Sequence, residues 1–557
     1  MAFQVSPGVQ VKEIDLTNVV PAVSTSVGAT CGKFAWGPAL EVTTVNSEKE
    51  LVQVFGEPLS GSEHAFFMGS TFLQYGRQLK IVRSLGAETN ATSSGAGFVV
   101  RNQNHYETLN TGGIEWIAKY PGAKGNSLTV HVCTAKNNAF TNWTYASNFS
   151  AAPSTSVYGT SVSAVDDEMH IIVVDADGAF SGVPGTILEK FEFLSQAKDA
   201  RKEDGSTNYY ASVINSQSAY VWFGDHAAAL TEAGDNIAGT DFSGFLTAQS
   251  YPLSNGSDGS ALTVNQLSIA YGYLDDSDTE TADFLIIGQP FSGTDAVTFT
   301  NVVVGVAETR KDIISFVSPP VDYTNGSSAT PLTDVLSWAN EVTSSSYAVL
   351  DSTSVYVYDK YNDTYRWIPA AGLVAGLCAN TDNVADAWFS PAGLNRGQLL
   401  GVTKVGFNPK RGDRDSLYQA RVNPIVSFPG EGTVLFGDKT ALARPSAFDR
   451  INVRRLFIIL EKAISTASRF QLFEFNDEFT RAQFRNLVEP FLRDVKGRRG
   501  ITDFLVVCDE TNNPGNVVDS NQFVADIYIK PARSINYITL NFVATRTGVE
   551  FSEIVGQ

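Results

Sequence analysis

Two short apolar runs, Phe284–Ile287 and Ile313–Val317, stand on either side of a helical stretch at about residues 294–310. Short, mainly apolar runs without alternation, of which the second contains one serine, Ser315, fit strands that are buried on both faces, as in a parallel sheet covered by helices. A strand, a helix and a second strand in this order form a βαβ unit, in which the strands are parallel and the crossover is right-handed. The sequence therefore predicts an α/β (α+β) fold built around this unit.

Residues 26–86 continue the α/β pattern. Ser47 and Glu50 have the spacing of a helix capping box, and Gly56 is placed to end that helix. A strand over Leu79–Arg83 closes the segment. We expect this part to pack as a compact α/β element.

Residues 87–260 differ in composition, because Ser, Thr, Gly, Asn and Asp dominate and basic residues are sparse. Short alternating runs such as Ser127–Val132 and His170–Val174 predict small strands joined by long loops. We expect an exposed, β-rich insertion in a multidomain chain.

The last 110 residues contain a well-marked amphipathic helix. Thr480 and Gln483 have the spacing of a capping box at its start, and Phe479 and Phe484 fit a hydrophobic staple around that cap. Its predicted buried stripe comprises Phe484, Leu487, Val488, Phe491, Leu492 and Val495. Its other face carries Arg481, Arg485 and Arg493.

Alternating strand patterns lie at both ends of the chain. Val9 and Val11 alternate with Gln10 and Lys12 near the N-terminus. Near the C-terminus, a hairpin is predicted whose first strand contains Ile527 and Ile529 and whose second contains Ile538, Leu540 and Phe542. A lone hairpin is marginally stable in water, so these strands need partners. The two ends either lend strands to neighbouring chains or pair with each other within one molecule, and the pattern alone favours the second.

The chain of 557 residues has a formal net charge of −19 at neutral pH. From Arg396 to Gln557 it has 22 basic and 18 acidic residues, so the acidic excess lies in residues 1–395. The overall sign argues against a protein that coats nucleic acid. The mildly basic C-terminal part is either an ordinary solvated surface, which composition alone favours, or a face for an acidic partner.

The sequence contains no recognisable catalytic or metal-binding constellation. None of its five histidines has a metal-binding spacing such as HExxH, and no P-loop or G-x-S-x-G motif occurs. The segment Gly288–Phe291 follows the first strand of the βαβ unit, where a doubly wound fold binds a nucleotide, but it lacks G-x-G-x-x-G. We therefore predict no catalytic residues, no metal and no cofactor, and an assembly protein rather than an enzyme. A ligand-binding protein or enzyme that uses the 284–318 βαβ unit remains an alternative.

Two acidic segments have some features of cation sites. Asp175–Gly178 resembles the start of a calcium loop, but the remaining ligands are out of register, which favours a turn. Asp275–Glu280 is more typical of a solvated loop.

The four cysteines, Cys31, Cys133, Cys378 and Cys508, are far apart in the sequence. We expect buried, reduced thiols in a protein that folds in a cytoplasm. No signal peptide is visible, and no apolar run approaches the roughly 18–20 residues of a membrane helix, so we expect no direct membrane insertion.

Several segments resemble the contractile-tail sheath proteins of T-even-like phages (the myovirus tail sheath family). The matching segments are SPGVQVKEID at 6–15, GKFAWGP at 32–38, YDKYNDTYRWIPAAGLVAGLCANTDN at 358–383, FSPAGLNRGQL at 389–399, GDKTALARPSAFDRINVRRLF at 437–457, FNDEFTRAQFRN at 475–486 and KPARSINYITLNFVATRTG at 530–548. They occur in the family's order and cover about 1–90 and 261–557, whereas 87–260 matches in general character only and looks shorter than in larger members.

The resemblance implies a structural protein of a contractile phage tail, present in the virion and assembled in the host bacterial cytoplasm. Subunits would form hexameric rings stacked helically around the tail tube protein, held in a metastable extended state. Contraction would drive the tube through the host envelope for genome ejection. The implied partners are other copies of the chain, the tube, the baseplate and tail terminator proteins, without nucleic acid. The sheath of a phage-derived contractile injection device is an alternative reading with the same chemistry.

The resemblance also implies roles for parts of the chain. Terminal arms would exchange strands between subunits, so the two ends would not pair within one molecule. The strand-arm candidates are Val9, Val11, Ile14, Ile527, Ile529, Ile538, Leu540 and Phe542. The tube-facing candidates, suggested by the basic excess and the amphipathic helix, are Arg481, Arg485, Lys496, Arg498 and Arg499, although intramolecular or ring-to-ring ion pairs fit these residues equally well.

The expected domains follow this division of labour. They are an N-terminal strand arm (1–22), a middle α/β and β-rich outer domain (23–90 with 115–325), a short outer insertion remnant (91–114), a C-terminal core domain facing the tube (326–515) and a C-terminal hairpin or arm (516–557).

Overall fold

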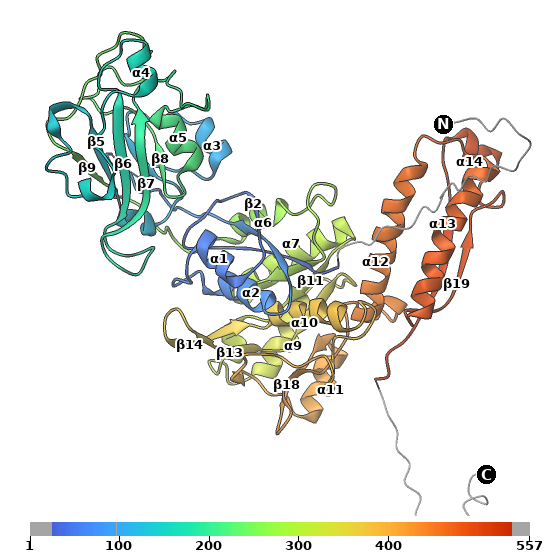
Figure 1. Cartoon of the computed structure of the whole chain (residues 1–557). Coiled ribbons are helices and arrows are strands. Elements are labelled where there is room, and N and C mark those ends of the chain that lie inside the picture. Colours follow the sequence, from blue (N-terminus) through green and yellow to red (C-terminus); the bar gives the residue numbers. More distant parts are fainter. Residues whose placement is uncertain (1–24, 96, 537–557) are drawn as a thin grey trace, which may run out of the picture. The chain divides into compact units, whose positions relative to one another are not determined.

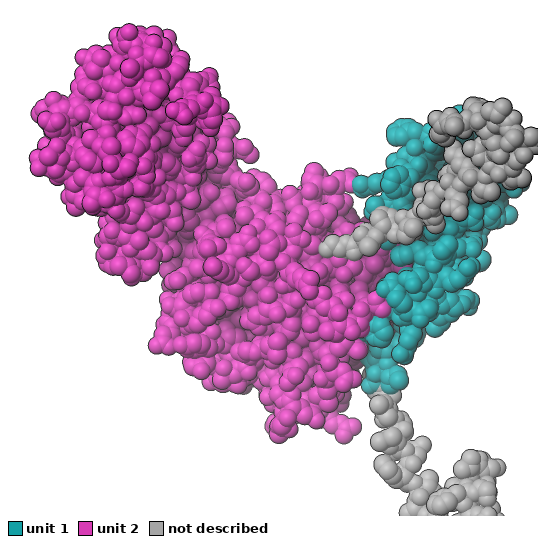
Figure 2. Space-filling model, viewed as in Figure 1, with its two compact units in different colours: residues 1–21, 388–390, 463–557 teal, residues 22–387, 391–462 magenta. Residues whose placement is uncertain are grey.

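The computed structural model describes residues 25–95 and 97–536. These residues form two compact units (Figure 2): unit 1 contains 388–390 and 463–536, and unit 2 contains 25–387 and 391–462. The boundary falls within helix α12 (Ile451–Ser468). The domain bounds expected from the sequence stay a prediction.

A seven-stranded sheet forms the centre of unit 2. Its strands are β1 (Val27–Gly32), β2 (Val42–Val45), β3 (Gln78–Arg83), β10 (Phe284–Ile287), β11 (Ile314–Val317), β12 (Ala348–Asp351) and β16 (Val422–Asn423). Their order is β16-β12-β11-β10-β1-β3-β2, and all neighbours are parallel except β2, which runs antiparallel to β3. The predicted βαβ unit is confirmed, since β10 pairs in parallel with β11 across the intervening helix.

Helices cover both faces of this sheet (Figure 1). The two faces separate within β10, where Phe284 and Ile286 join one apolar core while Leu285 and Ile287 join the other. The helices that contribute to the first core are α1 (Glu48–Phe55), α2 (Glu63–Leu73), α10 (Ala371–Val384) and α12. Those that contribute to the second are α6 (Val264–Gly272), α7 (Gly293–Arg310), α9 (Pro331–Glu341) and α11 (Arg411–Gln419), and the short α8 (Val321–Thr324) precedes α9. The α/β (α+β) fold is therefore confirmed.

Local capping residues begin and end these helices as the sequence indicates. The Ser47 hydroxyl accepts the N–H of Glu50 at the start of α1, and Gly56 ends the helix with φ 77°. The Glu50 carboxylate accepts the N–H of Asn46 rather than that of Ser47, so the reciprocal bond falls one residue earlier than in a capping box. Thr263 makes a complete capping box at α6.

Residues 87–260 form a β-rich part with its own apolar core. Its four-stranded antiparallel sheet has the order β7-β6-β5-β9, and β4 pairs with β8 beside it. The strands are β4 (Trp116–Ala118), β5 (Leu128–Thr134), β6 (Glu168–Asp175), β7 (Thr186–Ser195), β8 (Val221–Phe223) and β9 (Gln249–Pro252). The helices are α3 (Gln103–Glu107), α4 (Val157–Ser161) and α5 (Tyr210–Gln217), with 3₁₀ turns at Ala123–Ser127, Lys136–Asn138 and Ala146–Asn148. The predicted β-rich character is confirmed.

Two small antiparallel sheets follow the main sheet in sequence. Strands β13 (Ser354–Asp359) and β14 (Thr364–Pro369) form a hairpin, and β15 (Lys404–Val405) adds to its open side. Strands β17 (Ile425–Phe428) and β18 (Gly432–Leu435) form the second. A 3₁₀ turn at Ala447–Asp449 precedes α12.

Unit 1 is built from the end of α12, the long helix α13 (Glu478–Gly497) and a two-stranded sheet. The sheet consists of β19 (Ile501–Val507) and β20 (Asp526–Pro531), joined through α14 (Gly515–Asp519). A 3₁₀ turn at Arg469–Gln471 links the two long helices.

The predicted start of α13 is wrong. Asp477, not Thr480, is the N-cap, because its carboxylate accepts the N–H of Thr480. Phe479 is exposed, so it makes no hydrophobic staple with Phe484. The buried stripe is otherwise as predicted, apart from Phe491, which is half-buried. All four cysteines are free and buried.

Candidate assembly surfaces

The carboxyl end of β10 is closed by packing. The Gln289 side chain donates to the carbonyl of Ala296 at 3.3 Å and to the hydroxyl of Thr300 at 3.0 Å. A Cβ added at Gly288 would lie 2.8 Å from the side chain of Met68 on α2. This packing leaves no room for a ligand directly beside Gly288, which weighs against that part of the ligand-binding alternative.

Other polar clusters are structural turns. Asp175 accepts bonds from the Ser127 and Ser181 hydroxyls and from the N–H groups of Phe180 and Ser181, which confirms the predicted turn. Burial alone would raise the pKa of Asp175, but these hydrogen bonds outweigh it and lower the pKa. Among residues 25–95 and 97–536, no group of three or more His, Cys, Asp or Glu side chains is arranged to hold a metal ion. None of the helices in this part of the chain has both the length and the apolar character needed to cross a bilayer.

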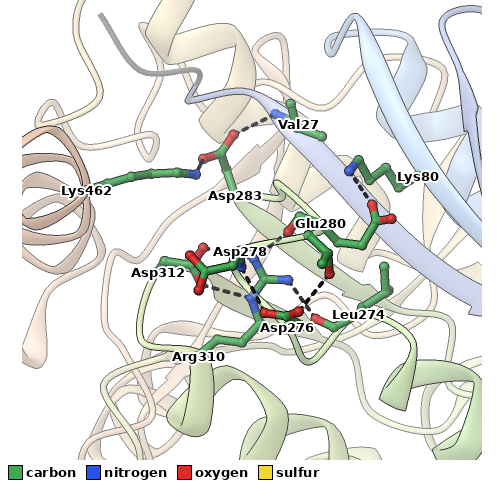
Figure 3. Close-up of polar contacts among 11 residues, drawn as sticks. Val27, Lys80, Leu274, Asp276, Asp278, Glu280, Asp283, Arg310, Asp312 and Lys462 are labelled. Atoms are coloured by element: carbon green, nitrogen blue, oxygen red, sulfur yellow. Dashed lines mark hydrogen bonds and ion pairs between the residues drawn. The ribbon is translucent and has the colours of Figure 1, made fainter. Parts of the chain in front are cut away.

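The acidic loop 275–280 is pinned from two sides (Figure 3). Arg310 donates to the carbonyls of Leu274 at 2.6 Å and Glu280 at 2.8 Å, and it pairs with Asp312 at 2.8 Å. Lys80 of β3 pairs with the Glu280 carboxylate at 2.5 Å. These contacts fix the approach to β10, and therefore the position of Asp283 just before that strand.

Asp283 ties the start of the described chain to α12 (Figure 3). One of its carboxylate oxygens accepts the N–H of Val27 at 2.9 Å, and the other lies 2.9 Å from Nζ of Lys462. The Asp283 N–H donates in return to the carbonyl of Val27 at 2.8 Å. The carboxylate is buried, and burial raises its pKa even though Lys462 and Val27 favour the charged form.

A second buried ion pair repeats this arrangement two helical turns earlier on α12. Arg455 donates to both carboxylate oxygens of Asp382 on α10 at 2.7 Å. Asp382 also accepts a hydrogen bond from the Thr25 hydroxyl. Because residues seven apart share one face of a helix, Arg455 and Lys462 together hold the first described residues of the chain against α12. We call these two ion pairs the arm-root clasp.

Sequence reasoning missed the arm-root clasp. The carboxylates and cations lie 73 and 179 residues apart, so no local spacing connects them. One signal was present, because Arg455 and Lys462 lie seven residues apart in a mainly apolar helix pattern, and a buried Arg or Lys needs a paired carboxylate.

The described strand-arm candidates lie in the sheet of unit 1. Ile527 is opposite Val506 and Ile529 is opposite Phe504, so β20 pairs with β19. The first strand of the predicted C-terminal hairpin therefore already belongs to a sheet whose other strand precedes it by about 25 residues. The remaining candidates lie outside the described residues: Val9, Val11, Ile14, Ile538, Leu540 and Phe542.

The tube-facing candidates do not form one patch. Arg481 is nearly buried near the start of α13, where its guanidinium donates to the Asn476 side chain at 3.2 Å, and Arg485 is half-buried. Lys496, Arg498 and Arg499 are exposed at the opposite end. At 1.5 Å per residue, Arg481 and Lys496 are separated by about 22 Å along the axis.

The exposed end of α13 is held by contacts within unit 1. Lys496 pairs with Asp503 of β19 at 3.1 Å, and Arg498 pairs with Asp494 at 2.9 Å. The Trp388 indole donates to the carbonyl of Arg498 at 3.1 Å, and the Arg498 guanidinium lies over its ring. The cations are thus fixed in place yet remain accessible, because the two ion pairs are solvent-exposed.

Comparisons with known proteins agree on one family. Residues 272–441 match the family described as phage tail sheath protein central domain, and residues 443–545 match phage tail sheath C-terminal domain. The chain is 34% identical over 657 aligned positions to the tail sheath protein of Enterobacteria phage T4, and 33% identical over 678 to that of Vibrio phage KVP40. Each alignment covers 99% of this chain and 99% of the relative.

A solved structure shares the fold over almost the whole chain. The sheath complex of the extracellular contractile injection system PVC, in its contracted state, is similar with a TM-score of 0.52 at 12% identity. The match covers 98% of this chain and 99% of that one.

Proposed function

This chain belongs to the tail sheath family of T4-like phages, whose members form contractile tails, and on that premise we propose that it polymerises as stacked hexameric rings around a tail tube. The observation that carries the proposal is 34% identity to a phage tail sheath protein with 99% of both chains aligned. The extended assembly is metastable. Its contraction drives the tube through the host envelope for genome ejection.

The energy for this movement is stored during assembly. An extended sheath that is kinetically trapped above a contracted state needs only a trigger from the baseplate to release the first ring. Rigid subunits then rotate against one another and form new contacts, ring by ring. The chain therefore acts as a structural protein without a catalytic step or a cofactor.

Strand exchange links the subunits during this change. Val9, Val11 and Ile14 of one copy and Ile538, Leu540 and Phe542 of another add to the β19–β20 sheet of a third. Among the described residues, β19 and β20 pair only with each other. Each of them therefore has an unpaired outer edge that can accept an added strand. The arm-root clasp supports this role, because it gives the N-terminal arm a fixed anchor at Thr25 and Val27.

The grip on the tube is weak and electrostatic. Lys496, Arg498 and Arg499 supply the exposed cations, whereas the other two candidates, the buried Arg481 and the half-buried Arg485, lie toward the opposite end of α13 and are not part of this face. Exposed ion pairs contribute only ~0–1 kcal/mol each, which suits a surface that must bind during assembly and release on contraction.

The remaining partners are the baseplate at one end of the sheath and the tail terminator at the other. The protein is a component of the virion tail, assembled in the host bacterial cytoplasm, and takes no part in nucleic-acid binding or membrane insertion. The sheath of an injection device is a less favoured alternative. The sequence identity to the PVC sheath is 12%, whereas the identity to the phage T4 sheath is 34%.

Negative-stain electron microscopy of the purified chain tests the proposal. Alone at high concentration, it should form striated hollow tubes or stacked rings with six subunits each, and the cognate tube should template longer, extended ones. A strict monomer with and without the tube and baseplate would contradict it.

A further inference from the structure

An exposed aromatic loop connects α12 to α13 in unit 1. We call residues 469–479 the phenylalanine loop. Its exposed apolar side chains are Phe470, Leu472, Phe473, Phe475 and Phe479, of which Phe475 is 85% exposed and Phe473 fully so. Five large apolar side chains within ten residues make a patch of the kind that marks a contact site on a soluble protein.

One residue of the loop has an unusual backbone conformation. Phe473 has φ 71°, a left-handed conformation that aromatic residues rarely adopt. Its ring is not buried by the described chain, so no intramolecular packing offsets that cost.

The phenylalanine loop is also acidic. Glu474 and Glu478 are both exposed, and neither has an ion-pair partner among the described residues. A surface that covers the loop should therefore be aromatic or apolar and should carry a cation.

Unit 2 presents such a surface on the outer side of the β13–β14–β15 sheet. Tyr358 is opposite Tyr365, and Tyr356 is opposite Trp367, so the four rings share one face. The rings of Tyr356 and Tyr365 are stacked with their centroids 5.4 Å apart, and the ring centroids of Tyr356 and Trp367 are 4.7 Å apart. Tyr358 and Tyr365 are each about half exposed.

Lys404 of β15 adds a charge to this aromatic face. Its Nζ lies 4.4 Å from the ring centroid of Tyr356 and 5.3 Å from that of Trp367. Within the described chain it has no carboxylate partner, and its side chain is exposed. The aromatic face thus combines ring surfaces and an accessible cation.

We propose that the phenylalanine loop of one copy docks on the aromatic face of a second copy of this chain. Phenylalanine rings would meet the tyrosine and tryptophan rings in edge-to-face or offset contacts, and Glu474 or Glu478 would approach Lys404. The phenylalanine loop is exposed within unit 1 and the aromatic face is exposed within unit 2. The inference rests on the proposed sheath function, because a contact between two different patches repeats from copy to copy and generates a helical array.

Cross-linking between copies tests the contact directly. One tagged copy carries Leu472→Cys, which keeps the phenylalanines, and a second, differently tagged copy carries Thr364→Cys, which keeps the aromatic face. The four natural cysteines are buried and should not compete. After co-assembly, a short bismaleimide should join the two tags. A matched control replaces Thr364→Cys by Leu246→Cys, a site 80% exposed in the β-rich part, and should give no cross-link.

A charge-exchange series gives a second measurement. Lys404→Glu alone, and Glu474→Lys with Glu478→Lys alone, should each raise the concentration required for assembly by about tenfold. Combining all three substitutions should return the concentration required for assembly close to its wild-type value. Circular dichroism of the soluble subunits identifies any variant that fails to fold.

The outcomes separate this contact from the sheath function. The contact would be overturned, and the function left standing, if the wild-type chain forms tubes but assembled Leu472→Cys and Thr364→Cys copies give no cross-link. A triple charge variant that assembles no better than the worse of its two parents would also overturn the contact. A loop that cross-links instead to the tube protein or to the N-terminal arm would also overturn it. A wild-type chain that forms no assembly would count against the function itself.

Discussion

Gly372 of α10 lies directly against Met68 of α2, with so little space that a Cβ on Gly372 would stand 2.6 Å from the Met68 carbonyl oxygen. The two helices therefore approach at the backbone, within the apolar core on one side of the main sheet. Gly376, one turn later, meets the ring of Tyr75 in the same way. This close contact explains the glycine spacing in the segment AAGLVAGLCAN.

Gly372→Ala should therefore lower stability. The added methyl forces α10 and α2 apart, and overpacking of this kind costs about 1–3 kcal/mol. The control is Gly305→Ala on α7, where nothing lies within 4 Å of the new Cβ. That variant should gain roughly 0.5–1 kcal/mol from helix propensity. Opposite shifts of the urea unfolding midpoint are expected, and equal shifts would contradict the close packing.

Breaking the arm-root clasp should release the start of the chain. Lys462→Met leaves the buried Asp283 carboxylate without its ion-pair partner, which costs about 3–5 kcal/mol. Hydrogen exchange at the Val27 amide should accelerate, because that amide is bonded to the same carboxylate. Burial already raises the pKa of Asp283, so protonation relieves the loss and the defect should shrink as pH falls.

A matched control for the clasp is Glu461→Gln, one residue away. Glu461 faces Arg454 at 3.6 Å and its side chain is 53% exposed. Its loss takes this carboxylate away from the buried Arg454 guanidinium and so lowers stability, but it should leave Val27 protected, because the Val27 amide is bonded to Asp283 and not to Glu461. Equal effects of the two substitutions on Val27 exchange would show that the clasp does not anchor the arm.

Local signals in the sequence were sufficient for much of the fold and insufficient for its long-range pairings. Ser47 and Gly56 act within a few residues, so the boundaries of α1 could be predicted. The start of α13 was ambiguous, because Asp477 and Thr480 are both good N-cap residues and Asp477 captures the Thr480 N–H. The partner of β20 depends on tertiary packing, since β19 is separated from it by α14 and two loops.

Asp351 should make stability depend on pH in the opposite sense to an ordinary carboxylate. Burial raises its pKa from 3.8 to about 7, although bonds from Ser318 and Thr353 favour the charged form. Between pH 3.8 and about pH 7, Asp351 is deprotonated in the unfolded chain but still protonated in the folded chain. The free energy of unfolding therefore falls as pH rises through this range. Across this pH range the free energy of unfolding should fall by up to about 4 kcal/mol.

Asp351→Asn isolates this contribution. Asparagine can still accept the Ser318 hydroxyl bond, which is 2.5 Å long in the native protein, but it does not titrate. The stability difference between the variant and the wild type should move in favour of the variant from pH 4.5 to pH 8. A difference that stays constant over this range would mean that Asp351 remains in one protonation state.

The proposed tube face predicts a cooperative electrostatic effect. Reversing Lys496, Arg498 and Arg499 to Glu together should weaken cosedimentation with purified tubes, and the wild-type interaction should weaken with salt. Single reversals should have little effect, because each exposed pair contributes ~0–1 kcal/mol. Arg493→Glu is the control, since its side chain is 73% exposed on the same helix and lies outside the candidate set. Unchanged tube binding by the triple variant would contradict the proposal.

Strand exchange by the N-terminal arm predicts that one backbone N–H matters more than the side chain that accompanies it. Val11→Pro removes a donor from the added strand and fixes its φ, so the arm should no longer extend the β19–β20 sheet of a neighbour. Val11→Thr keeps the branched shape and the N–H, and should retain assembly. Because position 11 precedes the arm-root clasp at Thr25 and Val27, neither change should alter the melting of unit 2. Electron microscopy should then find tubes for Val11→Thr and dispersed subunits for Val11→Pro. Long tubes from both variants would mean that the arm holds its neighbour through side chains alone, or that another contact drives polymerisation.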